Sequence, residues 1–315
     1  MSDSAPLVIG TRGSALALWQ ARRIQQQLRR HGHNSTLERI STRGDRVQDV
    51  PISEIGDEAV FTKELDRALL DERIDCAVHS LKDLPSRLPE GIALAAVGRR
   101  ASPFDAFVGH PDIDTPLEKL PEGAVIATAS LRRRAQLLAW RSDLTVVPVR
   151  GNVDSRLETL TESDWHGMVL AVAGLRRLDR GDVIRTVIPH AIMVPAVGQG
   201  ALGITCRTED SALRTLLRGT VHDLDTATAV TAERSFMKRI GGGCQVPTGA
   251  WARLNSSGQL VIDGCVAALD GSESFRTQKT APLDRADAVG ASLAQELLDA
   301  GGAEVLDGIR ASAPR

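Results

Sequence analysis

The sequence predicts an α/β protein with three domains: two α/β units and a small α+β unit at the C-terminus. Short apolar runs alternate with helix-like segments over the first two thirds of the 315 residues, which is typical of strand–helix units with a parallel sheet. Strand-like runs separated by turns follow near the C-terminus, as in an antiparallel meander. The length also exceeds what one hydrophobic core usually supports. We place the domains at 1–104 together with 195–220, at 105–194 and at 221–315.

The first unit begins with a strand, a cationic turn and a helix. Leu7–Gly10 is a short apolar run, and Ser14 is a good N-cap for a helix that continues to about Arg30. Arg12 lies between them, where helix N–H groups and a guanidinium form a natural anion site. A second strand is predicted at Glu38–Ser41.

A strand followed by Lys82 and Asp83 comes next. A long polar loop is predicted up to about Phe61, then an amphipathic helix at Thr62–Leu70 and a strand at Asp75–His79. Ligands bind beyond the carboxyl ends of the strands in parallel sheets. The lysine and the aspartate are therefore either an exposed ion pair of little consequence or an acid/base carboxylate beside an anion-binding lysine.

The second unit repeats one pattern three times: an apolar strand, then cationic or capping residues, then a helix. The predicted strands are Val125–Thr128, Thr145–Val149 and Met168–Val172, followed respectively by Arg132 to Arg134, by Arg150 and Arg156, and by Arg176 and Arg177. A cation at a helix N-terminus opposes the helix dipole, so three such placements favour a bound anion. Arginine grips carboxylates and phosphates in bidentate fashion. The pattern does not choose between a polycarboxylate and a phosphate.

Residues 198–203 contain a Gly-x-Gly-x-x-Gly match, which we interpret as coincidental. Strand-like Ala201–Cys206 follows it instead of a helix, and a lone match is a weak signal. A nucleotide-dependent oxidoreductase would rest on this match alone. No Gly-x-x-x-x-Gly-Lys-Ser/Thr segment occurs, which disfavours a nucleotide hydrolase. We expect the chain to return here and complete the first domain.

The most unusual segment is a glycine loop, Gly241–Pro247, at the end of a helix predicted from Thr226 to Arg239. Three consecutive glycines fit neither a helix nor a strand, and the loop presents Cys244 beside two upstream cations that would lower the pKa of its thiol. A buried structural cysteine is the alternative, but loops carry chemistry more often than cores do. The other cysteines lie in apolar, strand-like runs: Cys76, Cys206 and Cys265.

Beyond the glycine loop the sequence predicts the small α+β domain. Its three strands are predicted at Gly249–Leu254, Gln259–Leu269 and Glu273–Thr280, with glycine-rich and polar turns between them. A last helix from about Arg285 to Ala300 would cover that sheet.

Composition excludes several classes of function. The formal net charge of −2 argues against a general nucleic-acid binder. Four dispersed cysteines without a Cys-x-x-Cys pair and seven scattered histidines predict no metal site and a reducing compartment. No run approaches the ~18 apolar residues of a membrane span, and the first six residues do not resemble a secretory signal. We expect a cytoplasmic monomer; a removed transit peptide would leave an organelle open.

Seven segments, in order along the chain, are specific as a set: Gly10–Ala17, His79–Pro85, Ser130–Arg133, Arg150–Val153, Leu170–Leu175, Pro195–Ala201 and Gly242–Pro247. Together they resemble the hydroxymethylbilane synthase, or porphobilinogen deaminase, family. The resemblance covers the chain to about residue 250, and the last strands fit more loosely. It implies two α/β lobes similar to periplasmic binding proteins and a small third domain.

The resemblance implies an enzyme that links four porphobilinogen molecules head to tail, releases ammonia at each step and makes 1-hydroxymethylbilane. It implies a dipyrromethane cofactor held on Cys244 as a thioether. Asp83 would be the catalytic carboxylate that stabilises charge on the pyrrole nitrogen during ammonia loss and attack of the azafulvene-like electrophile, and Phe61 would stack on a pyrrole ring. The other cofactor- and substrate-binding positions would be Arg12, Ser14, Lys82, Thr128, Ser130, Arg132, Arg133, Arg150, Arg156, Arg177 and Gln199.

Two departures from the family pattern affect this transfer. Glu58 stands where relatives often have lysine, and Glu54 stands where some of them also have one. Lysine contacts are therefore not carried over to this loop. Ala129 replaces a common serine. The residues alone also allow a non-catalytic, two-lobed binding protein for organic anions, but that function would leave Cys244 and its glycine loop without a role.

Overall fold

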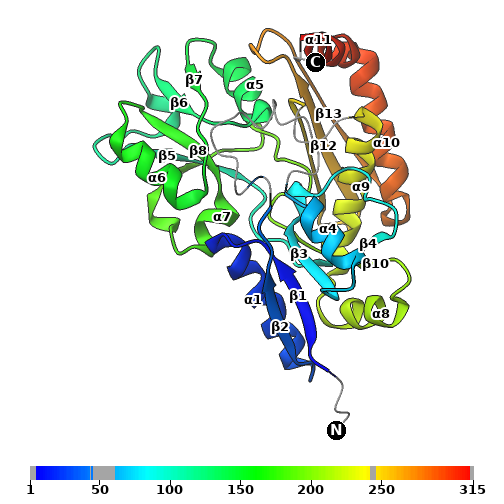
Figure 1. The fold of residues 1–315 in the computed structure, drawn as a ribbon. Coiled ribbons are helices and arrows are strands. Elements are labelled where there is room, and N and C mark those ends of the chain that lie inside the picture. Colours follow the sequence, from blue (N-terminus) through cyan, green and yellow to red (C-terminus); the bar gives the residue numbers. More distant parts are fainter. Residues whose placement is uncertain (1–4, 43, 45–60, 242–245, 313–315) are drawn as a thin grey trace.

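The computed structural model describes residues 5–42, 44, 61–241 and 246–312, whose strands form three sheets. Two sheets have five strands each and the third has three. Figure 1 shows the two five-stranded sheets in separate lobes, with the three-stranded sheet and its helices beside them. The α/β class with a small α+β domain is confirmed.

Lobe 1 is the blue and cyan part of Figure 1, completed by a strand from much later in the chain. Its sheet has the order β2-β1-β3-β10-β4. β1 is parallel to β2 and β3, whereas β10 is antiparallel to both of its neighbours. The elements are β1 (Leu7–Thr11), α1 (Ala15–Arg30), β2 (Ser35–Arg39), α4 (Lys63–Leu70), β3 (Cys76–Ser80), β4 (Ile92–Gly98), β10 (Leu202–Arg207) and α8 (Ser211–Thr220).

Lobe 2 repeats this arrangement with the order β7-β6-β8-β5-β9, and here β5 is the antiparallel strand. In each lobe the antiparallel strand is the first one after the chain crosses over. The two crossings touch, because the Ala101 N–H donates to the Gly200 carbonyl at 3.0 Å. The elements are β5 (Asp105–Gly109), β6 (Val125–Ala127), α5 (Leu131–Trp140), β7 (Thr145–Val147), α6 (Val153–Glu162), β8 (Gly167–Ala171), α7 (Val172–Arg177) and β9 (Ile184–Val187).

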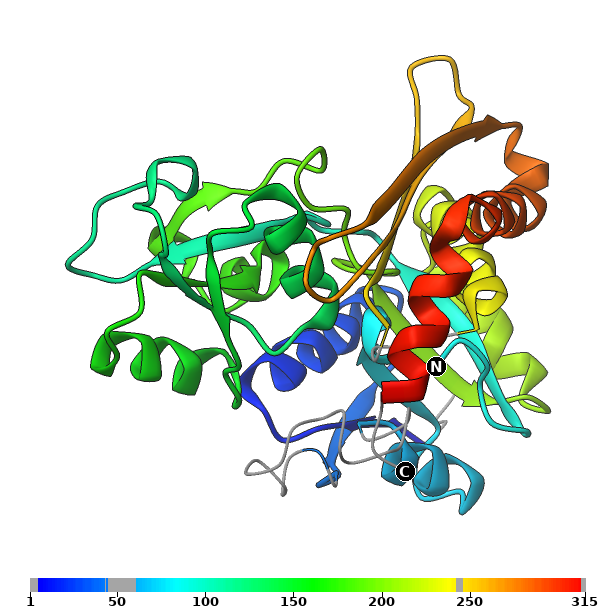
Figure 2. The same ribbon diagram turned by 90° about the horizontal axis from the view of Figure 1, so that it is seen from above.

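The third sheet is the predicted antiparallel meander, β11-β12-β13. Helices α9 and α10 pack against each other and against this sheet, and Figure 2 shows them and α11 together on one side of the strands. α9 also contacts β4 of lobe 1. The elements are α9 (Leu224–Ile240), β11 (Thr248–Leu254), β12 (Leu260–Ala267), β13 (Ser274–Ala281), α10 (Ala286–Leu297) and α11 (Ala303–Ser312).

Most predicted elements are confirmed, and one strand is corrected. The second strand lies at Ser35–Arg39 rather than Glu38–Ser41; Ile40 is apolar because it is buried beyond the end of that strand, against Leu65 and Leu69. The segment at 198–203 leads into β10, as expected for a coincidental glycine match. We propose the domain boundaries given above, since each sheet draws its strands from one of those ranges.

Candidate active site

The first part of the site lies between β1 and α1. The Ser14 hydroxyl accepts a hydrogen bond from the Ala17 N–H at 3.3 Å, so Ser14 caps α1 as predicted. Arg12 precedes it, and its guanidinium stacks over the Phe61 ring at 4.3 Å from the ring centroid. Residues 45–60 of the predicted loop, including Glu54 and Glu58, lie outside the described residues.

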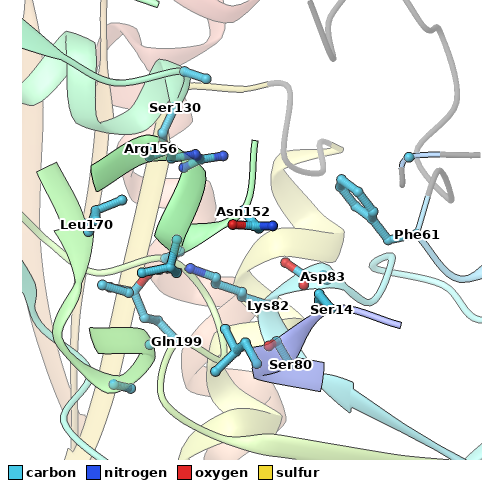
Figure 3. Close-up of a pocket in the computed structure, with 18 of the residues that line it drawn as sticks. Ser14, Phe61, Ser80, Lys82, Asp83, Ser130, Asn152, Arg156, Leu170 and Gln199 are labelled. Atoms are coloured by element: carbon cyan, nitrogen blue, oxygen red, sulfur yellow. Dashed lines mark hydrogen bonds between the residues drawn. The ribbon is translucent and has the colours of Figure 1, made fainter. Parts of the chain in front are cut away.

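The carboxyl end of β3 delivers Lys82 and Asp83, both carried by the single 3₁₀ turn Leu81–Asp83. The Lys82 ammonium donates to the Gln199 side-chain oxygen at 3.1 Å. Burial, followed by the charge of Arg133, lowers the pKa of Lys82 to about 8. Figure 3 shows Lys82 and Asp83 side by side, with Ser14 and Ser80 next to Asp83.

The N-terminus of α5 supplies a second wall. Ser130 caps the helix by accepting from the Arg133 N–H at 3.4 Å, and Thr128 accepts from the Ser130 N–H at 3.2 Å. Arg132 and Arg133 are both buried and both contact the carboxylate of Asp105, each at 2.8 Å. Their charges are therefore compensated in part inside the protein, which the sequence pattern did not indicate.

Asp105, which supports three of the predicted site residues, was not identified from the sequence. It is fully buried at the start of β5, and besides the two arginines it accepts from the Gln199 amide at 3.0 Å. Burial alone would raise its pKa, but Arg132 and Arg133 outweigh this and hold the pKa far below its usual range. An acid inside an otherwise apolar run was the available signal, because a buried charge needs partners.

The segment between β7 and α6 contributes Arg150, the first turn of α6 contributes Arg156, and both line the cavity described below. The Arg156 side chain donates to the Gly151 carbonyl at 2.8 Å. Burial, then the nearby charges of Arg133 and Arg150, lower the pKa of Arg156 to about 10. Asn152, which caps α6 and lines the same space, was not among the predicted site residues.

Arg177 corrects the third repeat of the predicted pattern. With Arg176 it lies in the last turn of α7 and not at its N-terminus, because the helix begins directly after β8 at Val172. At the C-terminal end the two cations interact favourably with the helix dipole instead of opposing it. Arg177 is nevertheless buried beside the site and donates to the Gly200 carbonyl at 2.6 Å.

These groups surround one cavity of about 1060 Å³ between the two lobes and the third domain. The volume is at the upper end of small-molecule sites. All the predicted site residues in the described part of the chain line it. Among those described residues, nine cationic side chains line it, Arg12, Arg39, Lys82, Arg132, Arg133, Arg134, Arg150, Arg156 and Arg177, against two carboxylates, Asp83 and Asp154.

Cys244 lies outside the described residues, but both ends of its loop are placed. α9 ends at Ile240. Gly241 is its C-cap, in the left-handed region with φ 71°, and Arg310 donates to the Gly241 carbonyl at 3.2 Å. Met237 before the loop and Val246 after it both line the cavity.

Within the described ranges, no group of three or more His, Cys, Asp or Glu side chains is placed to hold a metal ion. None of the described helices is long and apolar enough to cross a membrane. The fold and the cavity together define a two-lobed protein for a polyanionic ligand, with Asp83 available for acid–base or electrostatic chemistry.

Comparison with known proteins identifies the family. Two family profiles match: "Porphobilinogen deaminase, dipyromethane cofactor binding domain" at residues 7–215 and "Porphobilinogen deaminase, C-terminal domain" at residues 227–299. Porphobilinogen deaminase of Desulforudis audaxviator is 49% identical over 98% of this chain and 99% of its own. That of Nostoc sp. is 44% identical over 98% and 95%. The chain therefore belongs to the porphobilinogen deaminase family.

Membership assigns the family's transferase activity, that of a hydroxymethylbilane synthase, and its dipyrromethane cofactor. The likeness to solved structures is more distant. The methionine-binding protein MetQ has a TM-score of 0.43 and 11% identity, and the match covers 67% of this chain and 88% of MetQ.

Proposed function

We propose that the chain condenses four porphobilinogen molecules head to tail in this cavity, with Asp83 as the catalytic carboxylate. The observation that carries the proposal is the position of Asp83 at the end of β3, beside Lys82, in a cavity that the described cations line. Each pyrrole of the substrate carries an acetate and a propionate, which pair with the cations, and a ring N–H, which needs an acceptor. This arrangement supports substrate carboxylates on the arginines and the ring nitrogen at Asp83.

The role of Asp83 follows from the charge that develops during the reaction. The substrate's aminomethyl group reacts in its protonated form: the bond between the methylene carbon and the ammonium nitrogen breaks, and ammonia takes the electron pair and leaves. Positive charge then spreads to the pyrrole nitrogen, where the Asp83 carboxylate stabilises it. The methylene carbon bonds to the free ring carbon of the preceding unit, and that carbon releases its proton.

The residues of lobe 2 fit the dipyrromethane cofactor, whose side chains are carboxylates. Ser130, Arg132, Arg133, Arg150 and Arg156 all come from lobe 2, line the cavity and would hold these groups. When bound, the cofactor supplies the ring carbon to which the first substrate unit is joined. We propose its attachment to Cys244, because Met237 and Val246 on either side of that loop line the cavity.

We further propose a cytoplasmic monomer. Cys76 and Cys206 lie opposite each other on paired strands, and both are free thiols, which suits a reducing compartment. The large apolar side chains that the described surface exposes are scattered rather than gathered in one element: Trp19, Leu70, Val187, Leu224 and Leu283. A non-catalytic anion-binding protein is not favoured, because the chain belongs to a family of transferases.

Asp83→Asn tests the proposal, with Asp154→Asn as the matched control. The asparagine side chain would retain the size and position of the carboxylate but not its charge, so we expect turnover of porphobilinogen to fall by ~10²–10⁴-fold. Asp154, the other carboxylate that lines the described part of the cavity, lies 3.5 Å from Arg180 and should be replaceable without a comparable loss.

Intact-mass measurement of the same proteins separates binding from chemistry. Wild type and both variants should exceed the sequence mass by two linked pyrrole units. Near-normal turnover in Asp83→Asn would refute the role of Asp83, and an unmodified mass in active protein would refute the attachment to Cys244.

A further inference from the structure

We propose that Arg234 is a positioning residue for Asp83, and that one face of α9 holds the turn on which Asp83 sits. The inference rests on the proposed function of Asp83. It concerns a residue in the third domain that does not line the cavity and that none of the sequence motifs singled out.

Arg234 is bonded to the backbone directly behind Asp83. Its guanidinium donates to the Pro85 carbonyl at 2.9 Å and to the Ser86 carbonyl at 3.2 Å. The side chain is half-buried, and burial lowers its pKa, so the protein bears a cost to place a cation here. In this position the guanidinium satisfies two loop carbonyls, which lie two and three residues after the proposed catalytic carboxylate.

The turn has other polar contacts as well: the Leu81 N–H donates to the Ala201 carbonyl at 3.1 Å, and the Lys82 ammonium donates to Gln199 at 3.1 Å. Leu81–Asp83 is a single 3₁₀ turn closed by the Leu84 N–H to the Leu81 carbonyl at 3.1 Å. The chain between this turn and β4 is described throughout and contains no strand, so sheet hydrogen bonds do not fix it. Contacts from outside the loop must therefore determine where the Asp83 carboxylate points.

α9 supplies such contacts from one face. Val230 is buried and belongs to one apolar cluster with Leu81 and Leu84, the residues on either side of Lys82 and Asp83. Val230 and Arg234 are four residues apart and so lie on the same face of the helix. Apolar packing thus holds the turn from below while the guanidinium holds its following carbonyls.

The helix itself is firmly held. Glu233, adjacent to Arg234, is fully buried and pairs with Arg100, and it accepts from the Gly198 N–H at 2.7 Å and the Ala252 N–H at 2.8 Å. Met237, one turn after Arg234, already lines the cavity. α9 is therefore a rigid support that connects the third domain to the Asp83 turn.

Arg234→Met and Arg234→Lys test this inference against Arg207→Met. Like Arg234, Arg207 is half-buried, lies outside the cavity lining and donates to two backbone carbonyls, but these belong to Leu69 and Ile74 and not to the chain after Asp83. Displacement of a catalytic group by about 1 Å can cost ~10²-fold in rate. We expect the kcat of Arg234→Met to fall by about ten- to a hundredfold while KM for porphobilinogen changes by less than about threefold.

Lysine at 234 donates to one carbonyl without the fork of arginine, so it should recover part of the kcat. Amide exchange in residues 81–88 should be faster in Arg234→Met and unchanged in β10, and intact mass should show the cofactor retained. Val230→Ala, a milder change to the same face, should show the same split between kcat and KM.

Arg207→Met should retain the wild-type kcat. The inference is overturned if Arg234→Met keeps a wild-type kcat, if Arg207→Met loses as much, or if exchange rises throughout the protein instead of at the turn. Failure of the proposed role of Asp83 would look different, because Asp83→Asn would then keep near-normal turnover while the exchange result for Arg234→Met would still stand.

Discussion

Lys82 gives the site a pH dependence that can be traced to one atom. Its ammonium is held inside a cationic cavity, and the pKa of about 8 means that its charge is lost as pH rises through that value. The unbound enzyme should therefore bind carboxylates less well above pH 8. We expect KM for porphobilinogen to rise between pH 7 and pH 9.5, measured as initial rates in buffers of constant ionic strength.

Lys82→Arg provides the control, because a guanidinium stays charged over this range. In this variant the rise in KM between pH 7 and pH 9.5 should disappear. Retention of the same rise would show that another group titrates. That group would not be His79, because burial lowers the pKa of His79 to about 4.

Asp105 stabilises the fold as well as the site. Asp105→Asn would leave two buried guanidiniums without their shared carboxylate, so we expect the free energy of unfolding to fall by about 3–5 kcal/mol at pH 7. Because the folded-state pKa is depressed, the wild-type contribution is present above the unfolded-state pKa of roughly 4 and is lost as pH falls below it. The difference in urea unfolding between wild type and variant should thus shrink towards pH 3.

Asp114→Asn is the comparison for that experiment. Asp114 is 92% exposed and lies 3.6 Å from Arg185, and such surface pairs contribute little. Equal destabilisation by the two substitutions would contradict the role given to Asp105.

At the scale of elements, the close approach of α9 and α10 depends on one glycine. A Cβ on Gly290 would lie 2.0 Å from the Ala232 carbonyl oxygen of α9, whereas one on Gly308 of α11 would meet nothing within 4 Å. Gly290→Ala should lower the free energy of unfolding by about 1–3 kcal/mol. Gly308→Ala should raise it by up to ~1 kcal/mol, since alanine is the better helix former. Thermal unfolding of both variants should show shifts of opposite sign.

The elements that sequence could predict were those with a local signal. Ser14 and Ser130 are N-caps with a side-chain oxygen, and the helices after them begin where expected. α7 has Ala171 at its N-cap and no side-chain cap, so its start was missed and the position of Arg177 was wrong. β5 was not predicted as a strand, and residue 105 entered only as the start of the second domain.

At the scale of the molecule, sequence order did not reveal which residues share one cavity. Lys82 is in lobe 1, Asp105 in lobe 2 and Gln199 on the returning crossing, yet one chain of hydrogen bonds joins them. The motif resemblance placed Lys82, Arg132 and Arg133 around a common ligand. The pairing of Asp105 with Arg132 and Arg133 became visible only in the three-dimensional structure.

The cationic cavity makes the stability of the whole molecule depend on its anionic ligand. Burial and the charges of Arg133 and Arg150 lower the pKa of Arg156, so these cations repel one another when no anion is bound. Cys244→Ser protein, which cannot form the thioether, should therefore unfold at a lower temperature than wild type. The gap should narrow between 0.01 and 0.1 M NaCl, where the Debye length falls from ~30 to ~10 Å.

Removal of one cation from the Cys244→Ser variant tests the repulsion more directly. Arg156→Leu in the Cys244→Ser background should raise the unfolding temperature in low salt, although it deletes a side chain that donates to the Gly151 carbonyl. Arg185→Leu in the same background removes an exposed cation away from the cavity and should change the temperature little. A fall with Arg156→Leu would mean that its packing and hydrogen bond outweigh the repulsion. The cavity would then be stable without its ligand, and charge balance would not be what couples the lobes to the cofactor.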